Sequence, residues 1–447
     1  MQQKLGKSVV VFCTGKPCSV SYGLIKFRIL VPCLWDTINL PFVTINILAL
    51  NSHWYNCTHD RALETHLSLI MQKTAGRGGT RSSFEKLRTF LSTVDSENGF
   101  SRLKHIKFSN FLSNMTKTVD ILNGKKFHLE TVTVQTSTIG SHNSWKQFVE
   151  KHCQGSIRAV HMNAVRSGSN ILNWILNLKT LTEIRLIDCG PLNPSMSWGS
   201  LTSLKVFDIF FATKSAESMN SAIVLSKLSC MSKLQRLQLA NISIDERNLE
   251  RAISASGGFP DLEKISLRRS FAAQQINVNS INVLLFLLKN ANKLRVLDLQ
   301  GCSSFDMADV SCALGPLASR PTLEELDVSQ CDGKYGLGEM FDCHVKPNLA
   351  ALNLSSMKGA KAIHFDQFIL DFVNGNMNLK SLDIGRSPIT ERQILQIITG
   401  RNGLETLDLT GCYSAPRGWR QMVRRNKFSE LSRRIQQLMW MSNCLFY

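Results

Sequence analysis

Apolar residues recur along the chain at a spacing that predicts short strands buried on one side. Residues 292–302, NKLRVLDLQGC, reappear as NGLETLDLTGC at residues 402–412, with seven of the eleven positions identical. In this frame an apolar residue is followed by others three and five positions later, and by a cysteine eight positions later. The second and third apolar residues are two apart, so on an extended chain their side chains point to the same face. The side chain of the residue between them points to the opposite face.

A strand of this kind cannot bury its apolar face alone, so stacked copies are required. A third copy, PTLEELDVSQC at residues 321–331, keeps the apolar spacing and the cysteine. The frame recurs at intervals of 23 to 32 residues, at the long end of the range for leucine-rich repeats. The first apolar residues of the twelve frames are Leu103, Leu129, Ile157, Leu181, Leu204, Leu234, Leu262, Leu294, Leu323, Leu349, Leu379 and Leu404.

The intervals between frames leave room for helices. Thr390 and Gln393 resemble a capping box, and Gly400 stands where that helix should end. Residues 281–291, INVLLFLLKNA, are apolar on nearly all sides, as expected of a helix packed beneath its neighbours. The predicted fold class is therefore α/β: a leucine-rich-repeat solenoid, or horseshoe, of about twelve strand-helix repeats with a non-repeat N-terminal segment.

Three regions are predicted from this pattern. Residues 1–90 form a non-repeat segment and linker that includes the basic, glycine-rich stretch 72–83. Residues 91–412 form the repeat domain, and residues 413–447 form a basic helical cap, with its helix expected over 419–438. The uncharged run at residues 37–57 is interrupted by Pro41 and several polar residues, so no membrane span is predicted.

Charge and composition narrow the class of ligand. A chain of 447 residues with 43% hydrophobic and 19% charged residues can bury a large core. The net charge of +18 would suit nucleic acid or an anionic membrane. The 52 basic residues are scattered, however, and no nucleic-acid-binding signature accompanies them, which argues against nucleic acid as the main ligand.

The thirteen cysteines favour a structural role and a reducing compartment. Four of them share the last position of the frame and should stack as buried thiols: Cys189, Cys302, Cys331 and Cys412. We expect Cys302→Ser to cost about 1–3 kcal/mol, because a hydroxyl would need a partner in an apolar site. No CxxC pair suggests zinc or redox chemistry, and reduced thiols point to the cytoplasm or the nucleus.

Motifs of enzymes are not found in the sequence. It contains no phosphate-binding loop, no HExxH and no GxSxG. Asp342, Cys343 and His344 are adjacent, but catalytic groups are assembled in space rather than in sequence, so a loop is the better interpretation. We therefore predict a non-enzymatic protein with no catalytic, cofactor-binding or metal-binding residues and no cofactor.

The cysteine-ended frame LxxLDLxGC, at a period near 27 with helical connections, resembles the leucine-rich repeats of F-box substrate receptors. It is similar, less closely, to the ribonuclease-inhibitor class. The resemblance covers residues 103–412, and CLWDTINL at residues 33–40 resembles the segment that follows the F-box in those receptors. The three short helices that the family places before that segment are not recognisable in residues 1–32. Either truncation or alternative splicing has removed this adaptor-binding module, or the protein lacks one.

Two functions follow from the resemblance and the fold. In the first, the chain is the substrate-recognition part of a Skp-cullin-F-box ubiquitin ligase, with a protein substrate on the concave face and a Skp-type adaptor held by an N-terminal module. In the second, it is an interaction scaffold or inhibitor with the same repeats and no ligase link. Both are protein-binding functions, as expected of a solenoid with an extended concave surface.

The residue between the second and third apolar positions should project from the concave face. Basic or neutral residues dominate this position in the first half of the chain, and acidic residues dominate it in the second. The predicted partner-binding residues are Arg185, Asp298, Glu324, Glu325, Asp327, Asn353, Asp383, Glu405 and Asp408. Stacked carboxylates about 5 Å apart repel one another, so the acidic half should prefer a Lys/Arg-rich target and lose affinity with salt. Alternatively, aspartate is a common choice at this position and serves only the fold.

Overall fold

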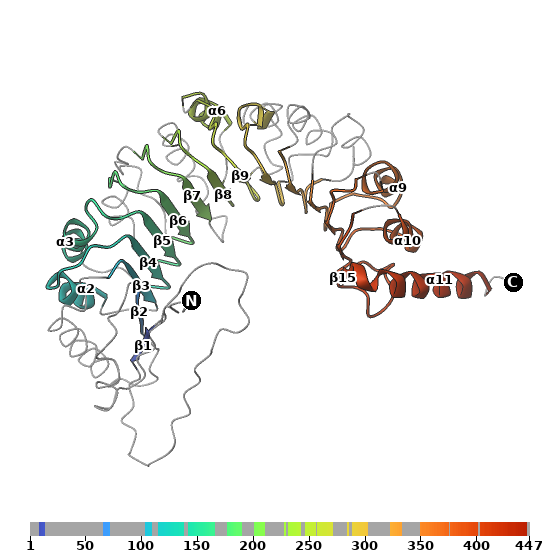
Figure 1. Ribbon diagram of the computed structural model, residues 1–447, viewed down its shortest axis with the longest axis horizontal. Helices are drawn as coiled ribbons and strands as arrows, with labels where there is room; N and C mark the ends of the chain where they lie inside the picture. The colour runs from blue at the N-terminus through green and yellow to red at the C-terminus, as the bar shows by residue number, and fades with distance from the viewer. Residues whose placement is uncertain are drawn as a thin grey trace, which may run out of the picture. The chain divides into compact units, whose positions relative to one another are not determined.

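The computed structural model describes residues 9–13, 66–71, 103–109, 115–137, 142–165, 177–189, 201–210, 228, 231–242, 246–255, 257–270, 284–285, 288–302, 322–332, 349–374, 376–400 and 403–444. The chain divides into two compact units, Met1–Leu201 and Thr202–Tyr447. Parallel strands with helices on one side make up each unit, so the α/β, solenoid-like class is confirmed (Figure 1).

The described residues of the first unit form six parallel strands and two helices. In chain order these are β1 (Val9–Cys13), β2 (His66–Met71), β3 (His105–Ser109), α2 (Met115–Asn123), β4 (Thr131–Gln135), α3 (His142–His152), β5 (Ala159–Asn163) and β6 (Glu183–Ile187). Each strand pairs with the next one along the chain. Strands β1 and β2 lie within residues 1–90, which were predicted to stand outside the repeats, so the sheet begins earlier than predicted.

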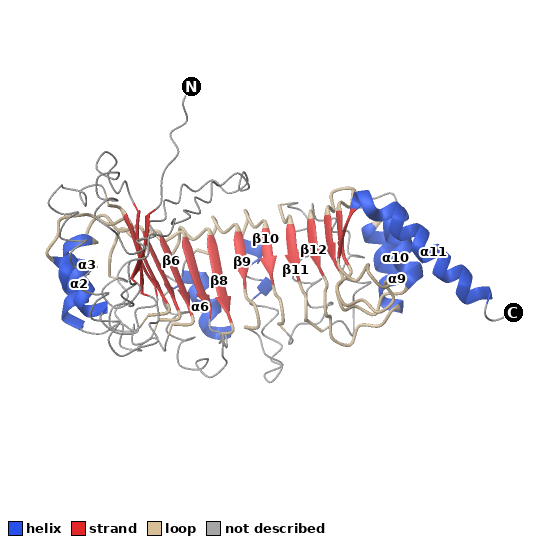
Figure 2. Ribbon diagram, turned by 90° about the horizontal axis from the view of Figure 1, so that it is seen from below, coloured by secondary structure: helices blue, strands red, loops and turns tan. Residues whose placement is uncertain are grey.

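The second unit has the same pattern, with nine strands among its described residues. Its elements are β7 (Val206–Phe210), β8 (Arg236–Ala240), α6 (Glu246–Ala255), β9 (Lys264–Ser266), β10 (Val296–Asp298), β11 (Glu325–Asp327), β12 (Ala351–Asn353), α9 (Ile363–Phe368), the π-helix η5 (Ile369–Val373), β13 (Ser381–Asp383), α10 (Glu391–Thr399), β14 (Thr406–Asp408), β15 (Met422–Arg424), the short helix η6 (Arg425–Lys427) and α11 (Phe428–Cys444). Strands β7 to β14 are parallel, and Figure 2 shows β8 to β12 side by side.

In each predicted frame the apolar strand residues lie on one buried face, and most residues of the opposite face are partly exposed. A strand begins two residues after the first apolar residue of each frame, and all twelve of those apolar residues are buried. Buried and partly exposed residues then alternate, as in Thr131–Gln135. The alternation of apolar and polar residues along each strand therefore gives the sheet an apolar face, on the side of the helices, and a polar face on the opposite side. We call the polar face of each sheet its open face.

The helix predicted after Leu379 is confirmed in detail. Thr390 accepts a hydrogen bond from the backbone N–H of Gln393, whose side chain accepts one from the backbone N–H of Thr390. The helix ends at Gly400, as predicted. Of the other predicted helix, residues 281–291, the structure describes 284–285 and 288–291. Residues 284–285 and 288–290 are helical, and Leu284, Leu288 and Ala291 are buried.

A turn of constant shape follows the strands. The residue seven positions after the first apolar residue has a positive φ wherever it is described, and the next residue points back into the core. These left-handed residues are Thr136, Ala164, Asp188, Asn241, Arg269, Gly301, Gln330, Ser356, Arg386 and Gly411.

The residue after this turn links neighbouring repeats. Cys302 Sγ lies 2.9 Å from the carbonyl oxygen of Leu267 in the preceding repeat. The same contact joins Cys331 to Leu299 at 3.1 Å and Cys412 to Ile384 at 3.1 Å. The four predicted cysteines are buried and free, and burial raises the pKa of the Cys189 thiol to about 12. The predicted structural role of the cysteines is therefore supported.

Serine takes the place of this cysteine in two repeats, and this changes the expectation for Cys302. Ser270 Oγ donates to the Leu239 carbonyl at 2.5 Å, and Ser387 Oγ donates to the Leu354 carbonyl at 3.3 Å. A hydroxyl at position 302 would find the same acceptor, so the 1–3 kcal/mol expected from the sequence is too large. We expect Cys302→Ser to lower the free energy of unfolding by less than about 1 kcal/mol, and Cys302→Ala by about 1–2 kcal/mol. Urea denaturation of both variants measures the difference, and equal losses would contradict the shared hydrogen bond.

An aromatic cluster encloses a histidine in the first unit. Trp145 and Phe148 of α3 contact Phe108 of β3 edge to face, with ring centroids 5.7 and 6.3 Å apart. His152 is fully buried, stacks on Phe127 at 4.0 Å and lies 3.2 Å from its carbonyl oxygen through Nδ1. Burial lowers the pKa of His152 to about 4.

This histidine should make the first unit sensitive to acid. Because the folded pKa lies below the usual value of 6.5, the unfolded chain binds the proton more tightly, and stability falls as the pH drops from about 6.5 to about 4. We expect a loss of about 2 kcal/mol between about pH 7.5 and pH 5. Denaturation curves at the two pH values measure it. His152→Phe should reduce the loss, whereas His128→Gln, at an exposed neighbour, should keep it; the reverse result would contradict this assignment.

The C-terminal segment covers the end of the second sheet. β15 runs antiparallel to β14, with Val423 opposite Leu407, and α11 turns Phe428, Leu431 and Ile435 inward. Arg433 and Arg434 are exposed on the same helix. A helix with a basic outer surface is therefore present, but it begins at Phe428. Residues 422–424, predicted as part of it, form a strand because their backbone hydrogen-bonds to the edge of β14.

Candidate functional site

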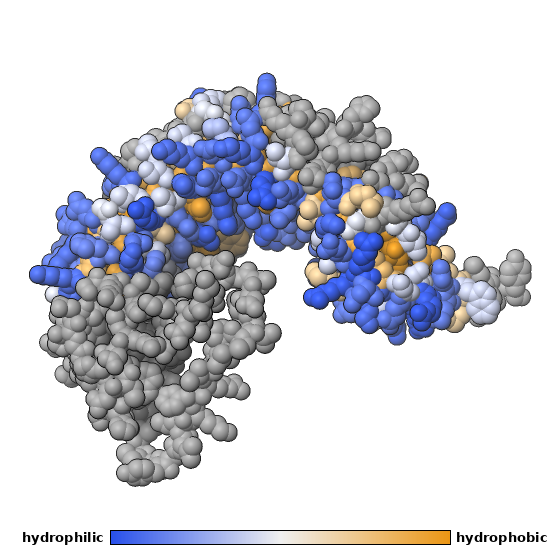
Figure 3. Space-filling view, viewed as in Figure 1, coloured by the Kyte–Doolittle hydropathy of each residue, from blue (hydrophilic) through white to orange (hydrophobic). Residues whose placement is uncertain are grey.

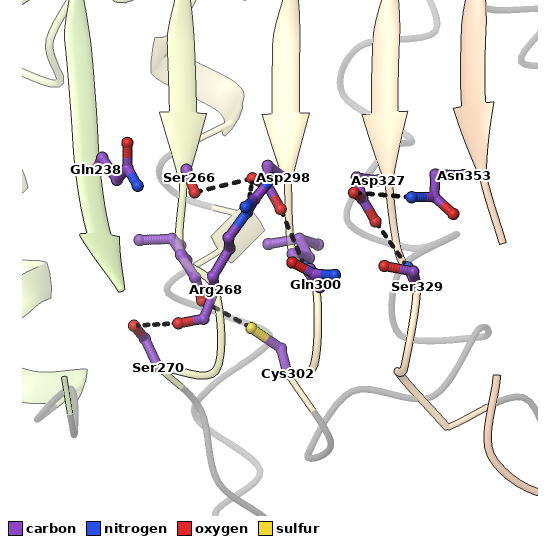
Figure 4. Close-up of polar contacts among 12 residues, drawn as sticks. Gln238, Ser266, Arg268, Ser270, Asp298, Gln300, Cys302, Asp327, Ser329 and Asn353 are labelled. Carbon is purple, nitrogen blue, oxygen red and sulfur yellow. Dashed lines mark hydrogen bonds and ion pairs between the residues drawn. The ribbon is translucent and has the colours of Figure 1, made fainter. Parts of the chain in front are cut away.

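One row of residues crosses the middle of each open face. It holds the residue between the two apolar strand positions, and we call it the ladder. Figure 4 shows part of this row in the second unit, where Gln238, Ser266, Asp298, Asp327 and Asn353 lie on neighbouring strands. Hydrophilic residues predominate over the described surface in Figure 3. In the first unit the ladder residues are Lys107, Thr133, His161 and Arg185, and in the second they are Asp208, Gln238, Ser266, Asp298, Asp327, Asn353, Asp383 and Asp408.

Five ladder residues use a side-chain oxygen to close the turn after their strand. Each accepts a hydrogen bond from the backbone N–H two residues later, an arrangement that Asp and Asn favour. The donor–acceptor distances are 3.2 Å for Asp298, 2.9 Å for Asp327, 3.0 Å for Asn353, 2.8 Å for Asp383 and 2.8 Å for Asp408. These strands have three residues, whereas β3 to β8 have five. These side chains therefore have a structural role in closing the turns.

In two repeats the ladder carboxylate is also neutralised by an arginine. Arg236 Nε lies 2.9 Å from Asp208. Arg268, which belongs to the repeat before that of Asp298, pairs with Asp298 through its Nε. Ser266 Oγ donates to the same carboxylate oxygen, Asp298 Oδ2, at 3.0 Å (Figure 4). Asp298 is only 6% exposed, so it lies within a hydrogen-bonded network and presents little charge to a partner.

From β11 to β14 no arginine or lysine forms an ion pair with a ladder carboxylate among the described residues. Asp327 accepts a hydrogen bond from Asn353 Nδ2 at 3.1 Å. Burial raises the pKa of Asp327 and of Asp383, and the neighbouring carboxylates add to each shift. Glu325 begins β11 and is exposed. The uncompensated acidic part of the open face consists of Glu325, Asp327, Asp383 and Asp408. It is smaller than the sequence suggested.

Two glutamates predicted to strengthen the acidic end lie just before their strands and are paired. Arg295 donates two hydrogen bonds to Glu324, at 2.9 and 2.7 Å, and Lys380 lies 3.3 Å from Glu405. Both pairs join neighbouring repeats on the exposed surface, where such contacts contribute little to stability. Their positive partners cancel much of the charge that the sequence pattern assigned to this end.

Arg185 belongs to the first unit, apart from the acidic residues with which it was grouped. Its Nε lies 2.5 Å from Glu183 Oε1, and the same oxygen lies 2.8 Å from His161 Nε2. These contacts hold the pKa of Glu183 below its usual value, with the His161 hydrogen bond as the largest cause. Glu183, Arg236 and Arg268 were all missed as open-face residues because they lie two positions before or after the ladder position.

Several other sequence-based predictions concern chemistry. Asp342, Cys343 and His344 lie outside the described residues, as do residues 33–40 and 72–83. Within the part of the chain that the structure describes, no group of three or more His, Cys, Asp or Glu residues could hold a metal ion. No described helix is both long enough and apolar enough to cross a membrane.

Comparison with known proteins gives little further information. No family model matches the sequence, and no curated protein matches it. A yeast structure, "Crystal structure of Rad7 and Elc1 complex in yeast", is 14% identical, with 77% of this chain and 89% of that chain covered and a TM-score of 0.40. A Toll–Spatzle complex from Drosophila is 11% identical, with 69% and 43% covered and a TM-score of 0.42. Because both TM-scores are below 0.5, neither similarity bears on function.

Proposed function

We propose that this chain is a non-enzymatic protein-binding module that uses the open faces of its parallel sheets. The observation that carries the proposal is a parallel sheet that the described helices cover on one side only. Parallel sheets are normally buried on both faces. Here the described helices lie on one side of the strands (Figure 1). The opposite side presents charged and polar residues from successive strands.

The partner proposed for the second unit is a protein with a Lys/Arg-rich segment. Four carboxylates on the open face form no ion pair with a described residue: Glu325, Asp327, Asp383 and Asp408. The cations of a bound partner would relieve the repulsion among these four groups. Because these groups are partly exposed, attraction should be screened over a Debye length of about 8–10 Å near physiological salt.

A labelled Lys/Arg-rich peptide tests this partner chemistry. We expect binding by the full chain to weaken several-fold when salt is raised from about 50 to about 300 mM. The double variant Glu325→Gln/Asp408→Asn should bind more weakly, whereas Glu250→Gln/Glu430→Gln, which removes two exposed charges from helices, should bind like the parent. Equal losses of peptide affinity in both variants would show that binding depends only on the net charge of the protein. That result would contradict a specific binding surface.

The finer proposal is that the chain is the substrate-recognition part of a Skp-cullin-F-box ubiquitin ligase in the cytoplasm or the nucleus. It is supported by the resemblance of the cysteine-ended repeats to F-box receptors and by residues 33–40. The alternative is an interaction scaffold or inhibitor without a ligase link. Co-purification separates the two: retention of a Skp-type adaptor by a chain extended with its genomic upstream sequence supports the receptor, and its absence under mild conditions favours the scaffold.

A further inference from the structure

We propose that the open face of the first unit, between β3 and β6, binds an acidic segment of a partner protein. The inference rests on the proposed protein-binding function, but it concerns a different surface and the opposite ligand charge from the acidic residues of the second unit. Lys107, Thr133, His161 and Arg185 lie in register across the four strands and form the centre of this surface.

Side chains with hydrogen-bond donors flank this central row. The twelve open-face positions of the four strands are His105, Lys107, Ser109, Thr131, Thr133, Gln135, Ala159, His161, Asn163, Glu183, Arg185 and Ile187. Only one of the twelve is acidic. An anion would therefore meet ammonium, guanidinium, hydroxyl and amide donors across most of the surface.

The single carboxylate is already engaged. Glu183 lies within hydrogen-bond distance of both His161 and Arg185, so its charge is used in orienting these two side chains. No ion pair joins Lys107 to another described residue. Ser109, two residues after Lys107 on the same face, is 6% exposed, and its hydroxyl has no hydrogen-bond partner among the described residues. The Lys107 ammonium is thus available to a ligand, whereas the Ser109 hydroxyl is buried beneath this surface.

The spacing of the two outer cations defines the ligand. Lys107 on β3 and Arg185 on β6 are separated by three strand intervals of about 4.8 Å, or about 14 Å. An extended peptide rises about 3.4 Å per residue, so acidic side chains about four residues apart would reach both cations at once. The row therefore fits an extended chain that crosses the strands.

The composition of this surface favours an acidic protein segment over a nucleic acid. Binding of single-stranded nucleic acid without sequence preference depends on aromatic side chains that stack on the bases. None of the twelve positions holds Phe, Tyr or Trp. Carboxylates of a peptide need only the donors that are present.

A labelled peptide of about twelve residues tests the proposal, with glutamates every fourth residue to match the spacing of about 14 Å. We expect Lys107→Gln/Arg185→Gln in the full chain to weaken its binding at least tenfold, because each change removes a charge-assisted hydrogen bond. Lys117→Gln/Lys126→Gln removes two exposed charges elsewhere in the same unit and should change affinity less than twofold. Thr133→Lys adds a cation to the row and should tighten binding.

Three results would overturn the proposal: equal loss in the two double variants, no loss in Lys107→Gln/Arg185→Gln, or a single-stranded oligonucleotide of equal charge that binds more tightly and displaces the peptide. The Glu325→Gln/Asp408→Asn variant separates this proposal from the one before it. It should leave the acidic peptide bound, even if the Lys/Arg-rich peptide shows no affinity for the second unit.

Discussion

Deletion of residues 418–447 is expected to lower the melting temperature by more than about 10 °C and to cause aggregation. The deletion removes β15 and α11 and uncovers the edge of β14. It also removes the buried side chains of Val423, Phe428, Leu431 and Ile435, whose burial together contributes roughly 6–12 kcal/mol at about 1.5–3 kcal/mol each. Differential scanning calorimetry measures the shift.

A matched pair of point variants separates packing from charge in this cap. Leu431→Ala/Ile435→Ala should lower the melting temperature substantially, because both side chains are fully buried. Arg433→Ala/Arg434→Ala changes the exposed side of the same helix and should have little effect. An unchanged melting curve after the deletion would show that the segment is a free tail, available for nuclear targeting or nucleic acid.

Substitution of a single glycine should have the second-largest effect. A Cβ added at Gly403 would lie 1.9 Å from the carbonyl oxygen of Met377 and 2.9 Å from its carbonyl carbon. Both atoms belong to the backbone of the preceding repeat, so no side-chain rotation can relieve the clash. We expect Gly403→Ala to lower the free energy of unfolding by about 2–4 kcal/mol, measured by urea denaturation.

Gly155 provides the control for this substitution. Its φ of +79° disfavours alanine, but no heavy atom lies within 4 Å of an added Cβ. Gly155→Ala should therefore show only backbone strain, of about 1 kcal/mol. If Gly403→Ala cost no more than Gly155→Ala, the close approach of the two repeats would be contradicted.

The apolar frame was enough to predict most strands. Each frame's strand begins two residues after its first apolar residue, and the capping box of Thr390 and Gln393 is present as expected. β2 was missed because the sequence position equivalent to Leu103 is Glu64, so the frame is incomplete there although Leu67 and Leu69 still alternate. The strand near Met422 was missed because its charged residues resemble a helix surface, and only the edge of β14 makes it extended.

The charge of the candidate site was less predictable than its position. Asp298 and Asp327 occupy the same position in frames with the same apolar spacing, yet Arg268 neutralises the first and Asn353 binds the second. These partners lie 30 and 26 residues away in sequence, at different offsets in their own repeats. The turn-closing role of the aspartates carried a local signal, since Asp or Asn at the end of five strands is typical of side chains that bind the N–H two residues later.

Under the proposed function, the uncompensated ladder carboxylates have two separable roles: one oxygen closes a turn, and the negative charge attracts a basic partner. Asn353 shows that an amide oxygen closes the turn equally well. Asp383→Asn/Asp408→Asn should therefore keep the melting temperature and lose affinity for a Lys/Arg-rich peptide. Asp383→Ala/Asp408→Ala should lose both, with about 0.5–1.5 kcal/mol of stability lost per site.

Parallel measurement of melting temperature and peptide affinity for these two double variants tests the account most directly. It predicts that both variants bind more weakly than the parent and that only the alanine variant melts earlier. Full peptide binding by the asparagine variant, with stability lost in the alanine variant, would show that the aspartates serve the fold alone and would contradict a binding role for this part of the open face.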